Sequence, residues 1–152
     1  MQTQAYITNS VSIAAPIATV WAALTQAEFT RQYMFGCAPI TNWALGGTID
    51  WEGTYEGVTA VFVKGNIVAI EAPNKLHYTV FDPMSTTMPD IPANYLTVTY
   101  DLEEADGITT LHLTQGDYTK VANGDARYAA GYNDGQGWQP ILDQIKAICE
   151  EA

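Results

Sequence analysis

Two histidines are the first candidates for acid–base chemistry in this chain of 152 residues. His77 and His112 each lie between two large residues of a predicted strand, in the segments Leu-His-Tyr and Leu-His-Leu. Because side chains alternate between the faces of a strand, both imidazoles are predicted to point away from the face that carries those neighbours. Neither has an Asp or Ser partner close by in the sequence, although folding could supply one. We interpret both as solvent-facing and predict no catalytic residue.

A small group of carboxylates, Asp50, Glu52 and Glu56, is the second candidate. Two carboxylates that shared a cavity would raise one pKa and could act as an acid and base pair. Asp50 and Glu52 alternate with Ile49 and Trp51, however, and this pattern favours an exposed acidic strand face. The sequence has no metal-ligand spacing, such as His-x-x-x-His, paired cysteines or an Asp-rich calcium loop, so we predict no metal.

The two cysteines, Cys37 and Cys149, lie far apart in the sequence. With no second Cys or His at ligand spacing, we expect both to be reduced thiols. Cys149 falls on the apolar stripe of the last predicted helix and is interpreted as a small core residue rather than a nucleophile. Gly46 and Gly47 precede a strand and lack a following Gly-Lys-Ser/Thr, so they predict a turn and no nucleotide cofactor.

The balance of acidic and basic residues makes some classes of binding partner unfavourable. Six Lys and Arg against 17 Asp and Glu give a formal charge of −11, which disfavours nucleic acid and anionic lipid surfaces. The sequence shows neither a signal-peptide pattern nor an apolar run of about 18 residues. We therefore predict a cytoplasmic protein with no nucleic-acid or membrane partner.

Aromatic residues are the remaining feature that could serve a site. Tyr and Trp combine an apolar body with one polar tip, which suits a pocket that orients a flat, mostly apolar molecule. Most of them would be core residues in any fold. Our candidate lining residues are Tyr33, Trp51, Tyr78, Phe81, Tyr95, Tyr118, Tyr132 and Trp138.

The elements that must position these residues begin with an alternating strand around Val11 and Ile13. Pro16 is predicted as the first residue of a helix, where its missing N–H costs nothing, and Ile17, Val20, Trp21 and Leu24 follow at helical spacing as one apolar stripe. Thr25, followed three residues later by Glu28, has the spacing of a capping box for a second short helix.

Strand patterns follow after the second helix. The segments that alternate or are rich in β-branched residues are 48–51, 65–71, 75–82, 95–103 and 108–118. Asp106-Gly107 between the last two is a strong hairpin signal. The connection 83–92 holds three prolines around Met84 and Met88 and is either a plain surface loop or an apolar lip over a pocket.

The C-terminus carries apolar residues at helical spacing: Trp138, Ile141, Leu142, Ile145, Ile148 and Cys149. Pro140 allows two interpretations. Either this helix begins near Trp138 with Pro140 in its first turn, or residues 126–132 belong to one longer helix that is kinked between Gly135 and Pro140. We favour the longer, kinked helix.

This order of elements resembles the START-like, or SRPBCC, domains of the heat-shock-protein-90 ATPase activator-like (AHSA-type) family. The resemblance runs nearly end to end, through Ala15-Pro16, Val20 to Thr25, Leu45-Gly46-Gly47, residues 71–76, residues 98–115 and Gly137-Trp138. Pro140 departs from the regular last helix of the family. The resemblance implies an α+β helix-grip fold: one curved antiparallel sheet wrapped around a long C-terminal helix, with two short helices after the first strand.

The resemblance also implies a function. We predict a single domain over residues 1–152 that binds or carries a small apolar or aromatic molecule between the sheet and the last helix. Similar domains include polyketide cyclases and hydrolases, so an enzyme that uses the same cavity is an alternative, and a co-chaperone is a third. Eukaryotic members that stimulate the chaperone carry a further N-terminal domain, so we expect no stimulation by this chain, which begins shortly before the motif.

Overall fold

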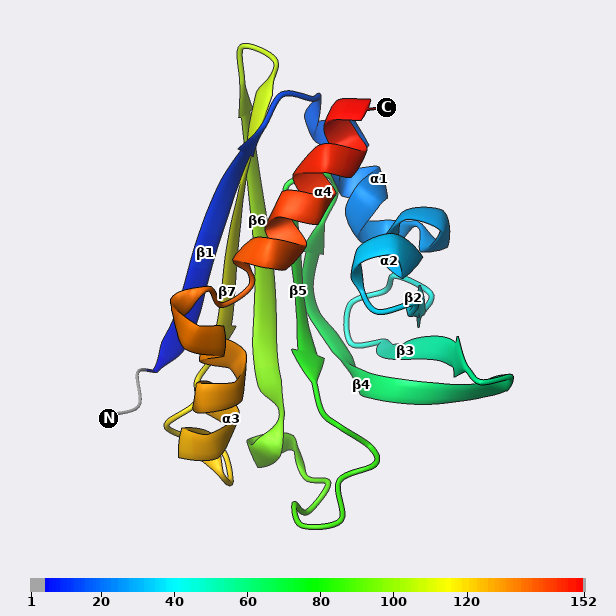
Figure 1. Cartoon of the computed structure of the whole chain (residues 1–152), viewed down its shortest axis with the longest axis vertical. Helices are drawn as coiled ribbons and strands as arrows, with labels where there is room; N and C mark the ends of the chain where they lie inside the picture. The colour runs from blue at the N-terminus through cyan, green and yellow to red at the C-terminus, as the bar shows by residue number, and fades with distance from the viewer. Residues whose placement is uncertain (1–4, 152) are drawn as a thin grey trace.

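The computed structural model describes residues 5–151, in which seven strands form one antiparallel sheet (Figure 1). Along the sheet the strands follow the order β1-β7-β6-β5-β4-β3-β2. Neighbours in this order are mostly neighbours in sequence, and tight turns connect β3 to β4, β4 to β5 and β6 to β7, whereas a longer connection joins β5 to β6. The strands are β1 (Tyr6–Ile13), β2 (Ala38–Ile40), β3 (Thr48–Tyr55), β4 (Val58–Glu71), β5 (Lys75–Val80), β6 (Leu96–Ala105) and β7 (Ile108–Gly116).

Four α-helices accompany the sheet: α1 (Ile17–Thr25), α2 (Ala27–Tyr33), α3 (Gly124–Tyr132) and α4 (Gln139–Glu151). The sheet curves around α4, which crosses its concave face (Figure 1). Helices α1 and α2 lie beside α4, and α3 lies near the start of β1. One 3₁₀ turn precedes β6 and another follows α3, at Pro92–Asn94 and Asn133–Gly135. This arrangement confirms the predicted α+β helix-grip fold.

The start of the chain differs from the prediction in two details. Pro16 has an extended backbone, with ψ of 151°, and lies directly before α1 rather than in its first turn. The predicted capping box is wrong, because Thr25 is the last residue of α1. Its hydroxyl donates to the Trp21 carbonyl oxygen at 2.9 Å, and α2 begins after Gln26 without a side-chain cap.

Strand β4 is longer than the predicted segment 65–71, because it begins at Val58 after a turn at Glu56 and Gly57. Its pairing with β3 shifts between Trp51, which pairs with Val63, and Glu52, which pairs with Val61. Phe62 is therefore the extra residue of a β-bulge. The Asp106-Gly107 hairpin is confirmed, and both residues adopt the left-handed conformation that a type I′ turn requires.

The favoured kinked C-terminal helix is wrong, and the alternative holds. Asn133 and Asp134 have φ of 48° and 57°, so the backbone leaves helical geometry between α3 and α4. Helix α4 begins at Gln139, which places Pro140 in the first turn, where no N–H is needed. Asn9 of β1 fixes this start, since its Oδ1 accepts a hydrogen bond from the Trp138 backbone N–H at 2.9 Å.

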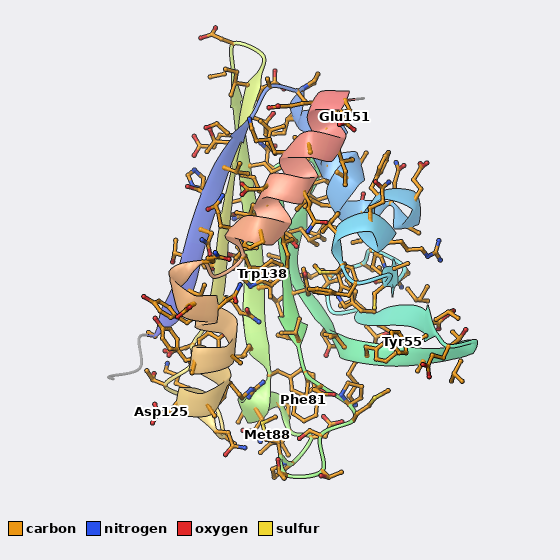
Figure 2. The ribbon with its side chains drawn as sticks, viewed as in Figure 1. Tyr55, Phe81, Met88, Asp125, Trp138 and Glu151 are labelled. Carbon is orange, nitrogen blue, oxygen red and sulfur yellow. The ribbon has the colours of Figure 1, made fainter. Side chains whose placement is uncertain are left out.

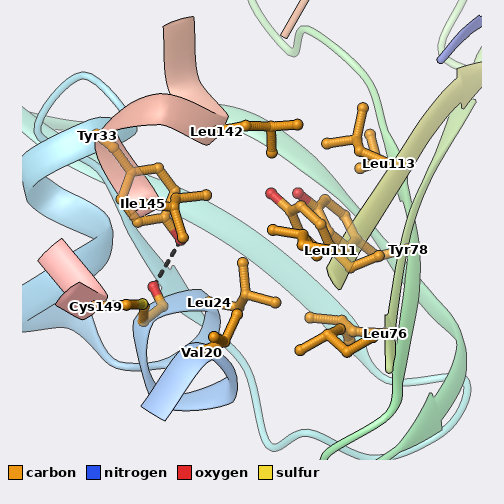
Figure 3. Close-up of a cluster of buried hydrophobic side chains, with 14 of the residues drawn as sticks. Val20, Leu24, Tyr33, Leu76, Tyr78, Leu111, Leu113, Leu142, Ile145 and Cys149 are labelled. Carbon is orange, nitrogen blue, oxygen red and sulfur yellow. Dashed lines mark hydrogen bonds between the residues drawn. The ribbon is translucent and has the colours of Figure 1, made fainter. Parts of the chain in front are cut away.

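The main core lies between α4, α1, α2 and the concave face of the sheet (Figure 3). Leu142, Ile145 and Cys149 of α4 are buried, as the predicted stripe requires. Tyr33 of α2 is also buried, and its hydroxyl donates to the Ala23 carbonyl oxygen at 2.7 Å (dashed line in Figure 3).

The open sheet ends in β1 and β2. Strand β2 has only three residues and includes Pro39. Side chains of α4 contact the backbone at the end of β1: the Lys146 ammonium donates to the Ser12 carbonyl oxygen at 2.8 Å, and Glu150 accepts from the Ala14 N–H at 2.8 Å. These contacts join the last helix to the first strand.

Candidate functional site

A cavity of about 450 Å³ lies between the concave face of the sheet, the start of α4 and the connection from α2 to β2. Strands β3, β4, β5 and β7 contribute to its wall. The residues that line it are mostly apolar: Met34, Phe35, Cys37, Trp51, Thr54, Tyr55, Phe62, Val63, Tyr78, Val80, Gln115, Trp138 and Ile141.

The cavity opens to solvent on the side of Phe35 and Tyr55, whose surfaces are 87% and 72% exposed. At its inner end Trp51 and Tyr78 are buried. Figure 2 shows two of the wall residues, Tyr55 near the turn between β3 and β4 and Trp138 at the start of α4. A ligand could therefore enter past two exposed aromatic rings and reach an apolar interior.

The aromatic rings of the interior contact one another. The ring of Tyr78 lies 5.8 Å from that of Trp51 and 6.0 Å from that of Tyr100, measured between centroids. The ring of Tyr100, behind the wall, also meets the Trp138 indole edge to face at 6.3 Å. These contacts fix the ring planes that a flat ligand would meet.

The polar groups of the wall are few and uncharged. The Trp138 indole N–H donates to the Gln115 side-chain oxygen at 2.8 Å, and the Thr54 hydroxyl is paired with that of Thr59 at 2.8 Å. Burial raises the pKa of the Tyr78 phenol well above its usual range, and the neighbouring Tyr100 raises it further. No Asp, Glu, His, Lys or Arg lies among the thirteen lining residues. The cavity can thus enclose an apolar molecule but offers no group that titrates near neutral pH.

Residues 14–150 match the family model described as Activator of Hsp90 ATPase homolog 1-like protein. The chain belongs to this family. No curated protein matches the sequence.

Solved structures support the same fold for this Hsp90 ATPase activator-like chain. A protein of Cytophaga hutchinsonii is 28% identical, with a TM-score of 0.73 over 99% of this chain and 97% of that one. An HSP90 activator from Plasmodium falciparum is 17% identical, with a TM-score of 0.60 over 91% and 96%. CalU16 from Micromonospora echinospora is 19% identical, with a TM-score of 0.65 over 95% and 75%. At these last two identities the likeness concerns the fold alone.

Three of the eight aromatic residues predicted to line a site, Trp51, Tyr78 and Trp138, lie together on the cavity wall of this family member. They come from β3, β5 and the start of α4 and are adjacent only in the folded chain.

The structure places the other five elsewhere. Tyr33 packs in the main core. Phe81 and Tyr95 stack on each other at 4.8 Å near the end of β5, and the Tyr95 hydroxyl donates to Asp90 at 2.6 Å. Tyr118 is buried in a second cluster below α3, and Tyr132 lines a separate cavity of about 210 Å³ beside β1.

Several lining residues were not predicted. Phe62 joins Val63 on the wall because of the bulge in β4, which breaks the alternation that would send it outward. Gln115 could have been found, because it follows Leu111 and Leu113 on the inward face of β7, where a polar residue is unexpected. Cys37 lies in the α2–β2 connection, for which the sequence carries no periodic signal.

The polar candidates lie away from the cavity. His77 pairs with Asp101 at 2.9 Å and His112 with Glu103 at 3.5 Å, partners that folding supplies from β6. Neither imidazole lines the cavity, as alternation predicts, and neither do Asp50, Glu52 and Glu56.

Met84 and Met88 of the proline-rich connection 83–92 do not line the cavity. This favours a plain surface loop over an apolar lip for this connection. Among residues 5–151, no group of three or more His, Cys, Asp or Glu could hold a metal ion, and no helix is long and apolar enough to cross a membrane.

The two thiols provide a direct probe of the cavity. Burial raises the pKa of Cys37 and raises that of Cys149 to about 11, so both are protonated at neutral pH. Only Cys37 lines the cavity. We expect methyl methanethiosulfonate, a small neutral reagent, to modify Cys37 at least about 10-fold faster than Cys149, because reaction needs thiolate and access. Peptide mass mapping over time measures both rates, and equal rates would contradict an accessible cavity.

Proposed function

We propose that this member of the Hsp90 ATPase activator-like family binds and carries a small apolar or aromatic molecule in the cavity between the sheet and α4. The observation that carries the proposal is the cavity itself. Its volume of about 450 Å³ falls within the range of roughly 300 to 1,000 Å³ that small-molecule sites occupy. Its wall is aromatic and apolar, with a small number of uncharged polar groups.

The residue types that line the cavity favour binding without catalysis. A cyclase or hydrolase in the same cavity would need a group that moves a proton near neutral pH. Burial keeps the Tyr78 phenol and the Cys37 thiol protonated, and the described wall holds no carboxylate or imidazole. We therefore propose a carrier rather than an enzyme.

The net charge and the cysteines of the chain support proposals about its partners and its cellular location. A net charge of −11 disfavours nucleic acid and anionic membranes as partners. The two free cysteines are consistent with a reducing compartment, so we propose a cytoplasmic location.

Ligand binding is expected to raise the melting temperature and to quench tryptophan emission. A ligand that binds only the native state stabilises it by RT ln(1 + [L]/Kd), about 2.7 kcal/mol at a concentration of 100 Kd. Trp51 and Trp138 lie on the wall, so a bound ring should change their emission. The neutral dye Prodan is a suitable probe, and native mass spectrometry of the freshly purified protein would reveal a co-purified molecule.

Saturable quenching by Prodan together with a rising melting temperature would support the proposal. A panel of neutral aromatic compounds that changes neither the melting temperature nor the emission would refute it. Acrylamide, which quenches the emission of accessible indole rings by collision, provides a control. It should quench Trp51 less strongly when the cavity is occupied.

A further inference from the structure

We propose that Gln115 is the polar anchor of the cavity and that the cavity therefore selects uncharged molecules with a hydrogen-bond-accepting oxygen, such as an aryl ketone. The inference rests on the proposed function and adds to it the chemical class of the ligand and the group that recognises it.

Gln115 lies where the fold favours an apolar side chain. It follows Leu111 and Leu113 on the inward face of β7, and both leucines are fully buried. Gln115 itself is half-buried and lines the cavity, so its polar atoms need partners from the protein, from water or from a bound molecule. Among the described residues, only the oxygen of the Gln115 amide has a hydrogen-bond partner.

The indole of Trp138 determines how the Gln115 amide is oriented. The indole N–H is only a donor, so the atom that it meets at 2.8 Å must be the side-chain oxygen of Gln115. The amide NH₂ consequently faces another direction. Within residues 5–151 no protein group accepts a hydrogen bond from this NH₂, so its two donors remain for a molecule in the cavity.

The Trp138 indole is itself held in place. Its backbone N–H donates to Asn9 of β1, and its ring meets that of Tyr100 edge to face. The amide therefore presents its donors in a fixed direction, which reduces the entropy lost when a ligand binds.

The register of the sheet places Tyr78, a second polar residue of the wall, relative to Gln115. Tyr78 pairs with Val98, and Val98 pairs with Gln115, so the three residues form one row across β5, β6 and β7. Two strand spacings separate Gln115 from Tyr78, about 10 Å along this row. A ligand whose oxygen meets Gln115 can thus extend its apolar body toward Tyr78 and Trp51.

Charge excludes carboxylates from the same position. An anion in the cavity would lose its hydration, and the wall supplies no Lys, Arg or His to compensate. The net charge of −11 adds an unfavourable field. The amide donors alone suit a neutral carbonyl oxygen better than a carboxylate.

Three naphthalenes of nearly equal size test the proposal: 2-acetylnaphthalene, 2-isopropenylnaphthalene, which replaces the carbonyl oxygen by a carbon, and 2-naphthoate. Titrations followed by tryptophan emission give the three dissociation constants. We expect the ketone to bind about 3- to 10-fold more tightly than the alkene, as one hydrogen bond predicts, and naphthoate to bind at least 10-fold more weakly than the ketone.

Gln115→Met keeps the length of the side chain and removes both its donors and the oxygen that accepts the Trp138 indole N–H. The ketone is then expected to bind no better than the alkene, while the affinity for the alkene stays within about twofold. Because the readout is a ratio of two ligands, a general loss of packing cancels. Gln144→Met, on the exposed side of α4, is the matched control and should keep the preference for the ketone.

These titrations distinguish failure of the Gln115 anchor from failure of the carrier function. If ketone and alkene bind equally to the unaltered protein, or if Gln115→Met keeps the preference, the anchor is refuted and the carrier function stands. Tight binding of naphthoate would also refute it. If none of the three compounds binds, the carrier function fails as well.

Discussion

Replacing Val63 by Trp is expected to lower the affinity for 2-acetylnaphthalene at least about 100-fold. Val63 lies on the cavity wall, in register with Trp51 of the neighbouring strand. A second indole there would occupy volume that the ligand needs. Keeping about 110 Å² of apolar ligand surface from burial corresponds to ~2.7 kcal/mol, or about 100-fold in affinity.

The same variant should remain folded, since filling a cavity commonly stabilises a protein by about 0.5 to 2 kcal/mol. Val68→Trp is the control, because Val68 belongs to the same strand but is 48% exposed and does not line the cavity. Titration and thermal unfolding of both variants make the comparison. Unchanged affinity in the Val63 variant would mean that the ligand binds elsewhere.

Gly65→Ala is expected to lower the free energy of unfolding by more than ~4 kcal/mol or to prevent folding, an effect reserved for severe disruption of a core. A Cβ atom at Gly65 would lie 1.7 Å from the Thr79 carbonyl oxygen. That oxygen belongs to the backbone of β5 and cannot move aside without breaking local pairing. Lys64 and Phe81 exchange two backbone hydrogen bonds beside it, at 3.0 and 2.8 Å.

Denaturation in urea measures this loss. Val68→Ala, three residues along β4 and exposed, should change stability by no more than about 0.5 kcal/mol. A Gly65 variant within about 1 kcal/mol of the unaltered protein would show that β4 and β5 can separate at this point.

The sequence predicted elements whose signals are local. The Asp106-Gly107 turn requires two left-handed residues, and the order of those two residue types is almost sufficient to identify it. The stripe of Leu142, Ile145 and Cys149 is equally local, because helical spacing alone sets it. The capping box at Thr25 failed because helix α1 extended through the residue that was expected to begin the next helix.

The break between α3 and α4 was harder to predict. It depends on left-handed backbone at Asn133 and Asp134 and on Asn9, which binds the start of α4 from the opposite end of the chain. A pattern within one segment contains no information about such a partner.

The cavity wall was predicted only in part for a similar reason. Residue type identified aromatic candidates, but the register and bulges of the sheet decide which of them share a cavity. Trp51 and Tyr78 meet there, whereas Phe81, just beyond β5, turns to stack on Tyr95. Phe62 reached the wall through a bulge that no propensity specifies. Gln115 is the exception, since alternation alone marks it as a polar residue facing inward.

The ends of the open sheet bear on how the protein behaves at high concentration. An unpaired strand edge is a template for intermolecular β-pairing and, eventually, for fibrillar aggregates. Strand β2 offers three residues, one of them Pro39, which lacks the N–H that pairing requires. At the other end the Lys146 ammonium already occupies the Ser12 carbonyl. The sheet can therefore hold an open apolar cavity on its concave side while its edges discourage growth into larger assemblies.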